Sequence, residues 1–281
     1  MRSLILLIGT FLLAGGPSYQ GALAHYNRTE YDASLKMLLA IPEKKAPVLA
    51  LLGQNYFMMR DPVRAVDYFQ QAVDLEPGNS TYYHWLGRAY GLRAEMGTMF
   101  TAMGNASKAR QNFEKAIELD PNNSEAVNDL FEFYVEAPGF VGGGLDKAEK
   151  LAQRIAAHDA AEGNYAAARI AEKRKEFPRA ENHLRKAMEL APRQVGRVID
   201  LAKFLAKHGN FEESEKTFQQ ADRIAPGSPK LMFARAAAYI QAKRNTDVAR
   251  HLLKRYLNAR LTPDDPPREE ARKLLEQVSG G

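Results

Sequence analysis

The chain has 281 residues, of which 45% are hydrophobic and 26% are charged. These proportions are ordinary for a folded chain and exclude a disordered or collagen-like protein. The formal net charge of +5 is too small to select a class of partner, and the lack of cysteine excludes disulfides, thiolate metal sites and a cysteine nucleophile.

The first residues carry the pattern of a secretory signal. Arg2 is followed by an apolar run over residues 4–14, which is too short to span a bilayer, and small residues come after it. We expect residues 1–18 to be a signal peptide, with cleavage after Ser18 favoured over cleavage after Ala24. An uncleaved anchor or a buried first helix is the alternative. Export predicts a periplasmic or secreted protein, with no stable membrane span once the signal is removed.

Two similar segments, LLGQNY around Gly53 and WLGRAY around Gly87, lie 34 residues apart. A period of this length is typical of a repeat built from two antiparallel helices. A set of four residues with the same spacing then occurs four times. The sets are Ala65, Phe69, Ala72 and Pro77; Ala109, Phe113, Ala116 and Pro121; Ala180, Leu184, Ala187 and Pro192; and Ser214, Phe218, Ala221 and Pro226. The later positions that correspond to Gly53 are Phe131, Ala168, Ala202 and Ala236.

This spacing has a physical explanation. A small residue at the Gly53 position lets the first helix of a pair approach the second closely, and an aromatic or leucine side chain such as Phe69 fills the gap between pairs. The proline that ends each unit stops the second helix, because it lacks the amide hydrogen and clashes with the preceding turn. One pair alone has too little apolar surface to fold, so neighbouring pairs must stack.

The pattern resembles the tetratricopeptide-repeat (TPR) family over nearly the whole mature chain. The resemblance implies an all-α fold, a right-handed α-solenoid of helix-turn-helix repeats with a concave inner face and a C-terminal capping helix. We assign residues 19–46 to a degenerate first repeat, 47–262 to the TPR solenoid, and 263–281 to the capping helix and tail. The segments YHWLGRAYGLRAE and FYVEAPGFVGGGLDKAEKLA resemble a recurring signature of exported bacterial TPR proteins of unassigned function.

The repeat over residues 81–121 contains about ten residues more than the one before it, inserted between its two helices. The insert places Met96, Met99, Phe100 and Met103 on one helical face. We expect a helical hairpin that extends past the edge of the solenoid. Its apolar face either packs the two long helices together, which is the interpretation we favour, or offers a second contact to a partner.

A glycine-rich stretch over residues 137–145 is followed by Lys147 and invites comparison with a phosphate-binding loop. The comparison fails, because Asp146 precedes the lysine, Ala148 stands where a hydroxyl is needed, and no strand is expected before the loop. We expect a tight connection between two helices, with Asp146 as the N-terminal cap of the second helix.

No two of the six histidines are three or four residues apart, and the sequence has none of the common nucleophile, metalloprotease or dinucleotide motifs. We therefore expect no metal site, no cofactor and no catalytic residues, and a protein that is not an enzyme. An active site assembled from distant residues is the alternative.

In the TPR family, ligands usually lie along the concave surface lined by the first helix of each pair. Carried over position by position, the resemblance implies that this groove presents Gln54, Phe57, His84, Arg88, Asn128, Glu132, Tyr165, Arg169, Lys173, Lys203, Lys207 and Phe233. Its C-terminal half gathers four basic residues: Arg169, Lys173, Lys203 and Lys207. Basic residues around aromatic side chains suit a protein or peptide partner, in particular an acidic one, rather than nucleic acid.

The leading hypothesis for function is a non-enzymatic scaffold or adaptor of the bacterial cell envelope, which binds a partner segment in this groove. One alternative is a structural subunit of an envelope complex that contacts its neighbours through the Met96–Met103 hairpin. An enzyme of unrecognised type is a further alternative.

Overall fold

The computed structural model describes residues 18–278, and within this range the chain forms fifteen α-helices, one short 3₁₀ helix and no strand. In chain order the helices are α1 (Tyr19–Asn27), α2 (Tyr31–Ala40), α3 (Ala46–Met58), α4 (Pro62–Leu75), α5 (Ser80–Glu95), α6 (Met99–Leu119), α7 (Ser124–Glu136), η1 (Gly139–Val141), α8 (Leu145–His158), α9 (Ala160–Lys173), α10 (Phe177–Leu190), α11 (Val195–Lys207), α12 (Phe211–Ile224), α13 (Pro229–Gln241), α14 (Thr246–Leu257) and α15 (Arg268–Gln277). This arrangement confirms the expected all-α solenoid.

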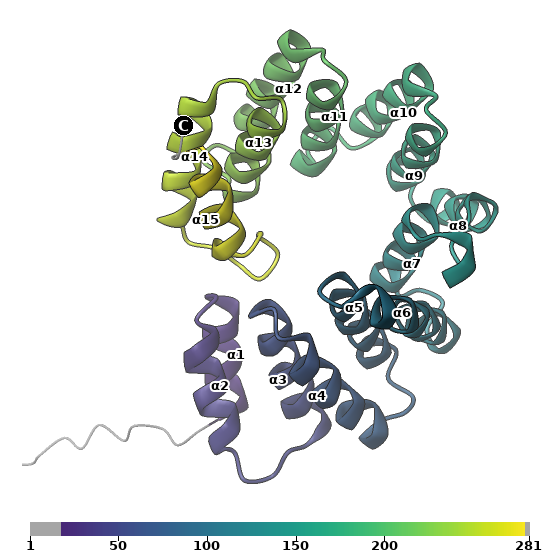
Figure 1. The fold of residues 1–281 in the computed structure, drawn as a ribbon, viewed down its shortest axis with the longest axis vertical. Helices are drawn as coiled ribbons and strands as arrows, with labels where there is room; N and C mark the ends of the chain where they lie inside the picture. The colour runs from purple at the N-terminus through teal and green to yellow at the C-terminus, as the bar shows by residue number, and fades with distance from the viewer. Residues whose placement is uncertain (1–17, 279–281) are drawn as a thin grey trace, which may run out of the picture.

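The helices form pairs that follow one another around a ring, with α1 and α15 near each other at the two ends (Figure 1). Most of the buried apolar side chains of residues 18–278 fall into five clusters along the chain. The first cluster runs from α1 to α7, and each of the other four joins successive helices. Such a succession of small cores is expected when a solenoid is stabilised by contacts between neighbouring pairs.

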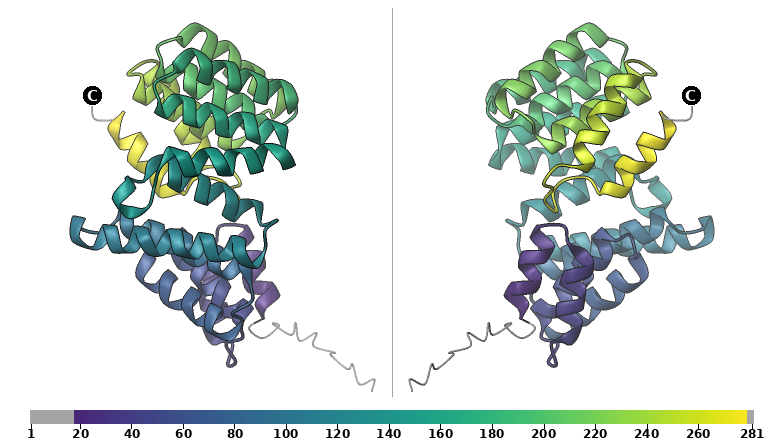
Figure 2. Two further views of the ribbon diagram at one scale, coloured as in Figure 1. Left: turned by 90° about the vertical axis from the view of Figure 1, so that its right-hand side faces the viewer. Right: turned by 90° about the vertical axis from the view of Figure 1, so that its left-hand side faces the viewer.

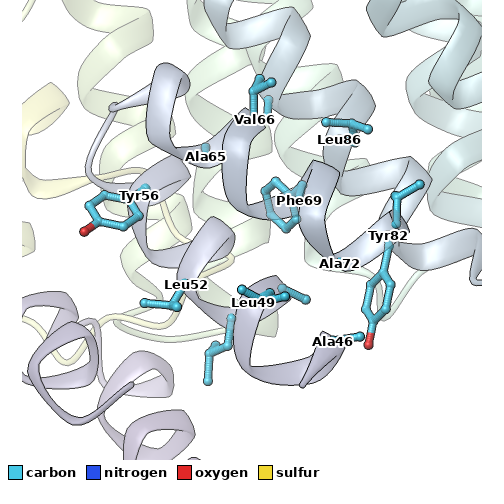
Figure 3. Packing of buried hydrophobic residues seen from close by; sticks show 14 of the residues in the cluster. Ala46, Leu49, Leu52, Tyr56, Ala65, Val66, Phe69, Ala72, Tyr82 and Leu86 are labelled. Carbon is cyan, nitrogen blue, oxygen red and sulfur yellow. The ribbon is translucent and has the colours of Figure 1, made fainter. Parts of the chain in front are cut away.

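The pair α3–α4 shows how the sequence sets the packing (Figure 3). Pro62 opens α4, where its missing amide does no harm, and the Asp61 side chain accepts a hydrogen bond from the Arg64 amide at 3.1 Å. Phe69 is fully buried, and a methyl group on Gly53 would stand 2.9 Å from its ring. The glycine therefore permits the close approach of α3 and α4 that the repeat pattern predicts.

The first pair, α1–α2, starts directly after the predicted signal peptide. Ser18 caps α1 by accepting a hydrogen bond from the Gly21 amide at 3.1 Å. The rest of the predicted signal peptide (1–18) lies outside the described residues. Ala24 lies within α1, so cleavage after Ala24 would remove most of a helix that contacts α2 and α3.

The helices of the third pair are longer than those before them. α5 has 16 residues and α6 has 21, whereas α3 and α4 have 13 and 14. In side view the end of the α5–α6 hairpin reaches beyond the other pairs (Figure 2). The inserted residues therefore lengthen both helices and build a projecting tip, which we define as residues 96–103.

The glycine-rich stretch connects α7 to α8 through η1. Gly142 and Gly144 have φ angles of +98° and +144°, in the region where glycine is favoured over other residues. The amides of Gly142–Gly144 all donate to carbonyls of the same loop or of α7, so they are not directed at a phosphate. The expectation that Asp146 caps α8 is wrong: Gly144 holds the N-cap position, and Asp146 lies in the first turn, where its charge favours the helix dipole.

The C-terminal helix α15 packs on α13 and α14 and also contacts the turns that follow α1 and α3. Its inner face buries Ala271. The Arg268 guanidinium donates to Thr29 Oγ1 at 2.8 Å, and Glu270 lies 3.6 Å from Arg60. The two ends of the solenoid therefore touch, and the helix pairs surround a central space that we call the lumen.

Candidate partner-binding site

The lumen contains a cavity of about 910 Å³ whose lining comes from both halves of the chain. Helices α3, α5 and α7 supply an N-terminal wall, α11 and α13 supply a C-terminal wall, and residues 263–267 complete the lining between them. Of the twelve groove residues expected from the sequence, five line this cavity: Phe57, Arg88, Glu132, Lys203 and Phe233.

An arginine stacked on aromatic rings marks the N-terminal wall. The Arg88 guanidinium lies 4.4 Å from the centre of the Trp85 ring and 4.9 Å from the centre of the Phe57 ring. Trp85 also stacks on Phe69, with ring centres 5.8 Å apart, which joins the platform to the buried core. Asp129 stands 3.7 Å from the guanidinium. These contacts hold Arg88 in place, so the wall presents a fixed cation beside an apolar surface.

The C-terminal wall presents Lys203 from α11 and, one turn apart on α13, Lys230 and Phe233. Neither lysine forms an ion pair with another described residue, although both charges act on the nearby Asp200. Burial raises the pKa of Asp200, and Arg197, at 3.0 Å, opposes that shift. The wall therefore offers two ammonium groups and one aromatic ring to a guest in the lumen.

The basic cluster expected from the sequence is largely neutralised within the chain. The ion pairs join Arg169 to Glu132 at 2.8 Å and to Glu136 at 2.9 Å, Lys173 to Glu136 at 2.8 Å, and Lys207 to Glu172 at 2.8 Å. The Lys173 ammonium holds the pKa of the Glu136 carboxyl below its usual value, in keeping with a formed ion pair. Of the four basic residues expected in this half of the groove, only Lys203 is without an ion pair among the described residues, because carboxylates on the neighbouring helices face the other three.

The remaining groove residues expected from the sequence do not line the cavity. His84 is only 2% exposed, and its Nε2 lies 2.8 Å from a carboxylate oxygen of Asp129. Tyr165 is half-buried, and burial raises its pKa. Asn128 borders a separate cleft of about 290 Å³, and Gln54 is half-buried on α3. His84 therefore contributes to the packing of α5 on α7 rather than to a surface for a partner.

Other lumen residues escaped the sequence analysis. Lys230 and Asp200 lie outside the helix positions that the family pattern assigns to the groove, and Pro263–Pro267 and Glu270 belong to a segment expected only to cap the solenoid. The spacing of Lys230 and Phe233, three residues apart on one helix face, could have indicated the lysine. Residues 263–267 carry no comparable sequence pattern, because their place in the cavity lining depends on how far the whole solenoid turns.

The apolar residues of the tip are exposed to solvent. Met99 and Phe100 are 81% and 90% exposed, and Met96 and Met103 are 52% and 46% exposed. The favoured sequence interpretation, that these side chains pack the two long helices together, is therefore wrong. The packing of α5 on α6 is made nearer the solenoid, where Ala109 is buried.

Neither a metal centre nor a membrane span is found in the described part of the chain. No group of three or more histidine or carboxylate side chains within residues 18–278 is placed to hold a metal ion. No helix in that range combines the length and the apolarity that crossing a bilayer requires.

The fold and the lumen define the class of the protein as an α-solenoid of helical repeats. Two segments, residues 92–123 and 171–231, match sequence profiles described as tetratricopeptide repeat. The comparison with curated proteins gave no match. With the 34-residue period and the solenoid of helix pairs, these matches show that the chain contains tetratricopeptide repeats.

Solved structures agree on the fold. This chain is similar to a tetratricopeptide repeat protein from Parabacteroides merdae, with a TM-score of 0.58, 14% identity, and 92% of this chain and 96% of that chain covered. A thermophilic TPR protein from Thermus thermophilus has a TM-score of 0.55 and 19% identity, with 66% and 96% covered. Yeast Tom70 also has a TM-score of 0.55 and 19% identity, with 89% of this chain and 50% of Tom70 covered. At these identities the likeness shows the fold alone.

Proposed function

We propose that the chain is a non-enzymatic scaffold or adaptor of the bacterial cell envelope that binds a segment of a partner protein in the lumen. The observation that carries the proposal is the two-walled cavity, in which each wall places a cation beside an aromatic ring. Arg88 lies beside Phe57 on one wall, and Lys230 lies beside Phe233 on the other. Aromatic and arginine side chains are the residue types that dominate the energetics of protein interfaces.

The lining favours a short amphipathic segment over a purely acidic one. Its carboxylates outnumber its basic residues by eight to four, so an acidic guest would meet repulsion over much of the surface. Lys203 and Lys230 are the exception on the C-terminal wall. We propose that the partner carries an acidic residue for these lysines and apolar side chains for Phe57 and Phe233. The volume of about 910 Å³ suits a short segment and not a folded domain.

A charge reversal confined to the C-terminal wall tests lumen binding. With the mature chain as bait in an envelope extract, Lys203→Glu/Lys230→Glu should abolish recovery of the partner. The matched control Lys186→Glu/Lys254→Glu, at exposed positions on second helices of their pairs, should retain it. Arg169, Lys173 and Lys207 stay unchanged in both variants, since replacing them would break ion pairs within the chain. Equal recovery by the two variants would contradict lumen binding.

The envelope location rests on the signal pattern of residues 1–18. N-terminal sequencing of the protein recovered from the periplasmic fraction tests it directly. We expect Tyr19 as the first residue, because cleavage after Ser18 leaves α1 whole. A cytoplasmic protein that retains Met1 would contradict export and leave the fold unaffected.

The alternative role as a structural subunit requires the tip, residues 96–103, to bind a neighbouring protein. Loss of co-purifying proteins on mutation of the tip, with no loss on mutation of the lumen, would favour this alternative. Three of the eight lumen carboxylates, Glu132, Asp200 and Asp129, are each held by a cation or a histidine of the chain, which gives no support to the alternative of an enzyme.

A further inference from the structure

We infer that the tip of the α5–α6 hairpin docks on an anionic lipid surface. The inference concerns a surface outside the lumen and does not depend on the proposed function. It starts from two consecutive side chains, Met99 and Phe100, which are the two most exposed large apolar side chains among the described residues. Transfer of apolar side chains out of water is favourable. An exposed apolar surface such as the tip therefore indicates a site that a binding partner covers.

The tip also lacks charge. No charged residue occurs between Glu95 and Lys108, in a chain in which 26% of residues are charged. Glu95, at the end of α5, is paired with Arg60 at 2.9 Å. Thus the segment that projects furthest from the ring is uncharged and apolar at its end (Figure 2).

Cations lie behind this apolar end. Lys108 is eight residues from Phe100 along α6, which places it about 12 Å further back. Its ammonium lies over the Tyr90 ring at 5.2 Å and is exposed, and Arg93 forms no ion pair with another described residue. An element that binds at a membrane surface inserts its apolar face about 5–10 Å into the boundary between headgroups and acyl chains. At that depth Lys108 and Arg93 would meet the lipid phosphates.

A neighbouring loop adds a second apolar side chain to the same side of the ring. Phe140 is 77% exposed in η1, which packs against α6. Lys147, at the start of α8, is exposed and donates to the carbonyl of Gly142, two residues after Phe140. An exposed aromatic ring with an exposed lysine near it in the chain therefore occurs twice, as Phe100 with Lys108 and as Phe140 with Lys147.

A lipid surface accounts for the tip better than a second protein does. The exposed parts of its four apolar side chains amount to roughly 500 Å², given the area of side chains of this size. A stable protein interface buries about 800 Å² on each partner. The tip projects from the ring, so lipid can reach it without contact to the rest of the solenoid. Lipid requires no complementary pocket.

The test uses a probe fixed at one position, which the lack of cysteine makes simple. An environment-sensitive fluorophore on Thr101→Cys reports on the tip, and the same fluorophore on Gln194→Cys reports on the turn before α11, at the opposite ends of the helices. Each labelled full chain is titrated with vesicles of phosphatidylcholine, alone or with phosphatidylglycerol. We expect a blue shift and a gain in intensity at Thr101→Cys with phosphatidylglycerol vesicles, weakened by salt, and no change at Gln194→Cys.

Substitutions then separate lipid docking from other contacts. In the Thr101→Cys background, Met99→Ser/Phe100→Ser should weaken vesicle binding by at least roughly tenfold, while Leu75→Ser/Leu190→Ser, at exposed apolar positions near other turns, should leave it unchanged. No response at Thr101→Cys, or an equal response at both labels, would overturn the inference. A concentration-dependent dimer that Met99→Ser/Phe100→Ser abolishes, without a response to vesicles, would also overturn it and assign the tip to a protein contact.

Discussion

Gly87 and Gly91 lie one turn apart on α5, and alanine should have opposite effects at the two positions. A methyl group on Gly87 would stand 2.6 Å from the Phe113 ring and 3.2 Å from the carbonyl oxygen of Ala109. A methyl group on Gly91 would meet no heavy atom within 4 Å. Gly87→Ala and Gly91→Ala therefore compare the same substitution in the same helix, with a steric conflict at Gly87 and none at Gly91.

The magnitude follows from two opposing effects. Replacing glycine by alanine inside a helix stabilises it by about 1 kcal/mol, whereas overpacking a buried site costs about 1–3 kcal/mol. Ala202 and Phe218 occupy the corresponding positions of α11–α12, so a methyl and a ring can coexist when the helices shift slightly apart. We therefore expect Gly87→Ala to lower the free energy of unfolding by up to about 2 kcal/mol and Gly91→Ala to raise it by about 0.5–1 kcal/mol.

Urea denaturation followed by far-ultraviolet circular dichroism measures both changes. If the midpoint shifts while the dependence of the unfolding free energy on urea concentration stays the same, the stability has changed and the surface exposed on unfolding has not. In α9–α10, Ala168 is followed by Leu184 at the position of Phe113, so Phe113→Leu added to Gly87→Ala should recover part of the loss. If Gly87→Ala stabilised the chain as much as Gly91→Ala does, the account of how the helix pairs pack would be refuted.

Three further predictions concern turns, caps and charge. Lys175 has a φ angle of +63°, so Lys175→Gly should raise the free energy of unfolding by about 0.5–1 kcal/mol, and Gly209→Ala, with φ +86° at the corresponding turn, should lower it similarly in thermal melts. The Asp159 side chain accepts hydrogen bonds from two amides at the start of α9, so Asp159→Ala should cost about 1–2 kcal/mol in urea. Lys173 lowers the pKa of Glu136, so this carboxyl contributes stability above its ordinary pKa of 4.5, and that contribution is lost as the pH falls through the lower folded value. As the pH is lowered below about 4.5, the free energy of unfolding of Glu136→Gln should therefore fall less than that of the parent chain.

The repeat pattern was sufficient to predict the fold, because steric contact at each landmark depends only on nearby sequence. Gly53 and Phe69 meet within one helix pair, so their spacing carries the information about that contact. The groove was predicted less well. Whether Arg169 is free depends on what faces it from α7, and the sequence gives no direct measure of which charges on separate helices meet.

The tip shows a second limit of periodicity. The spacing of Met96, Met99, Phe100 and Met103 indicated correctly that they share a helix face, but a shared face does not say what that face meets. The same holds for residues 263–267, which join the lining of the lumen only because the solenoid turns far enough to bring them back to α3 and α5.

Photo-crosslinking in the native envelope tests the central claim most directly. A photoreactive amino acid in place of Phe233 reports on the lumen, and one in place of Lys254 reports on the outer surface of α14. Binding in the lumen predicts one crosslinked protein at position 233, its loss on Lys203→Glu/Lys230→Glu, and no crosslink to that protein at position 254. The same protein crosslinked equally at both positions, or at position 254 alone, would contradict the account.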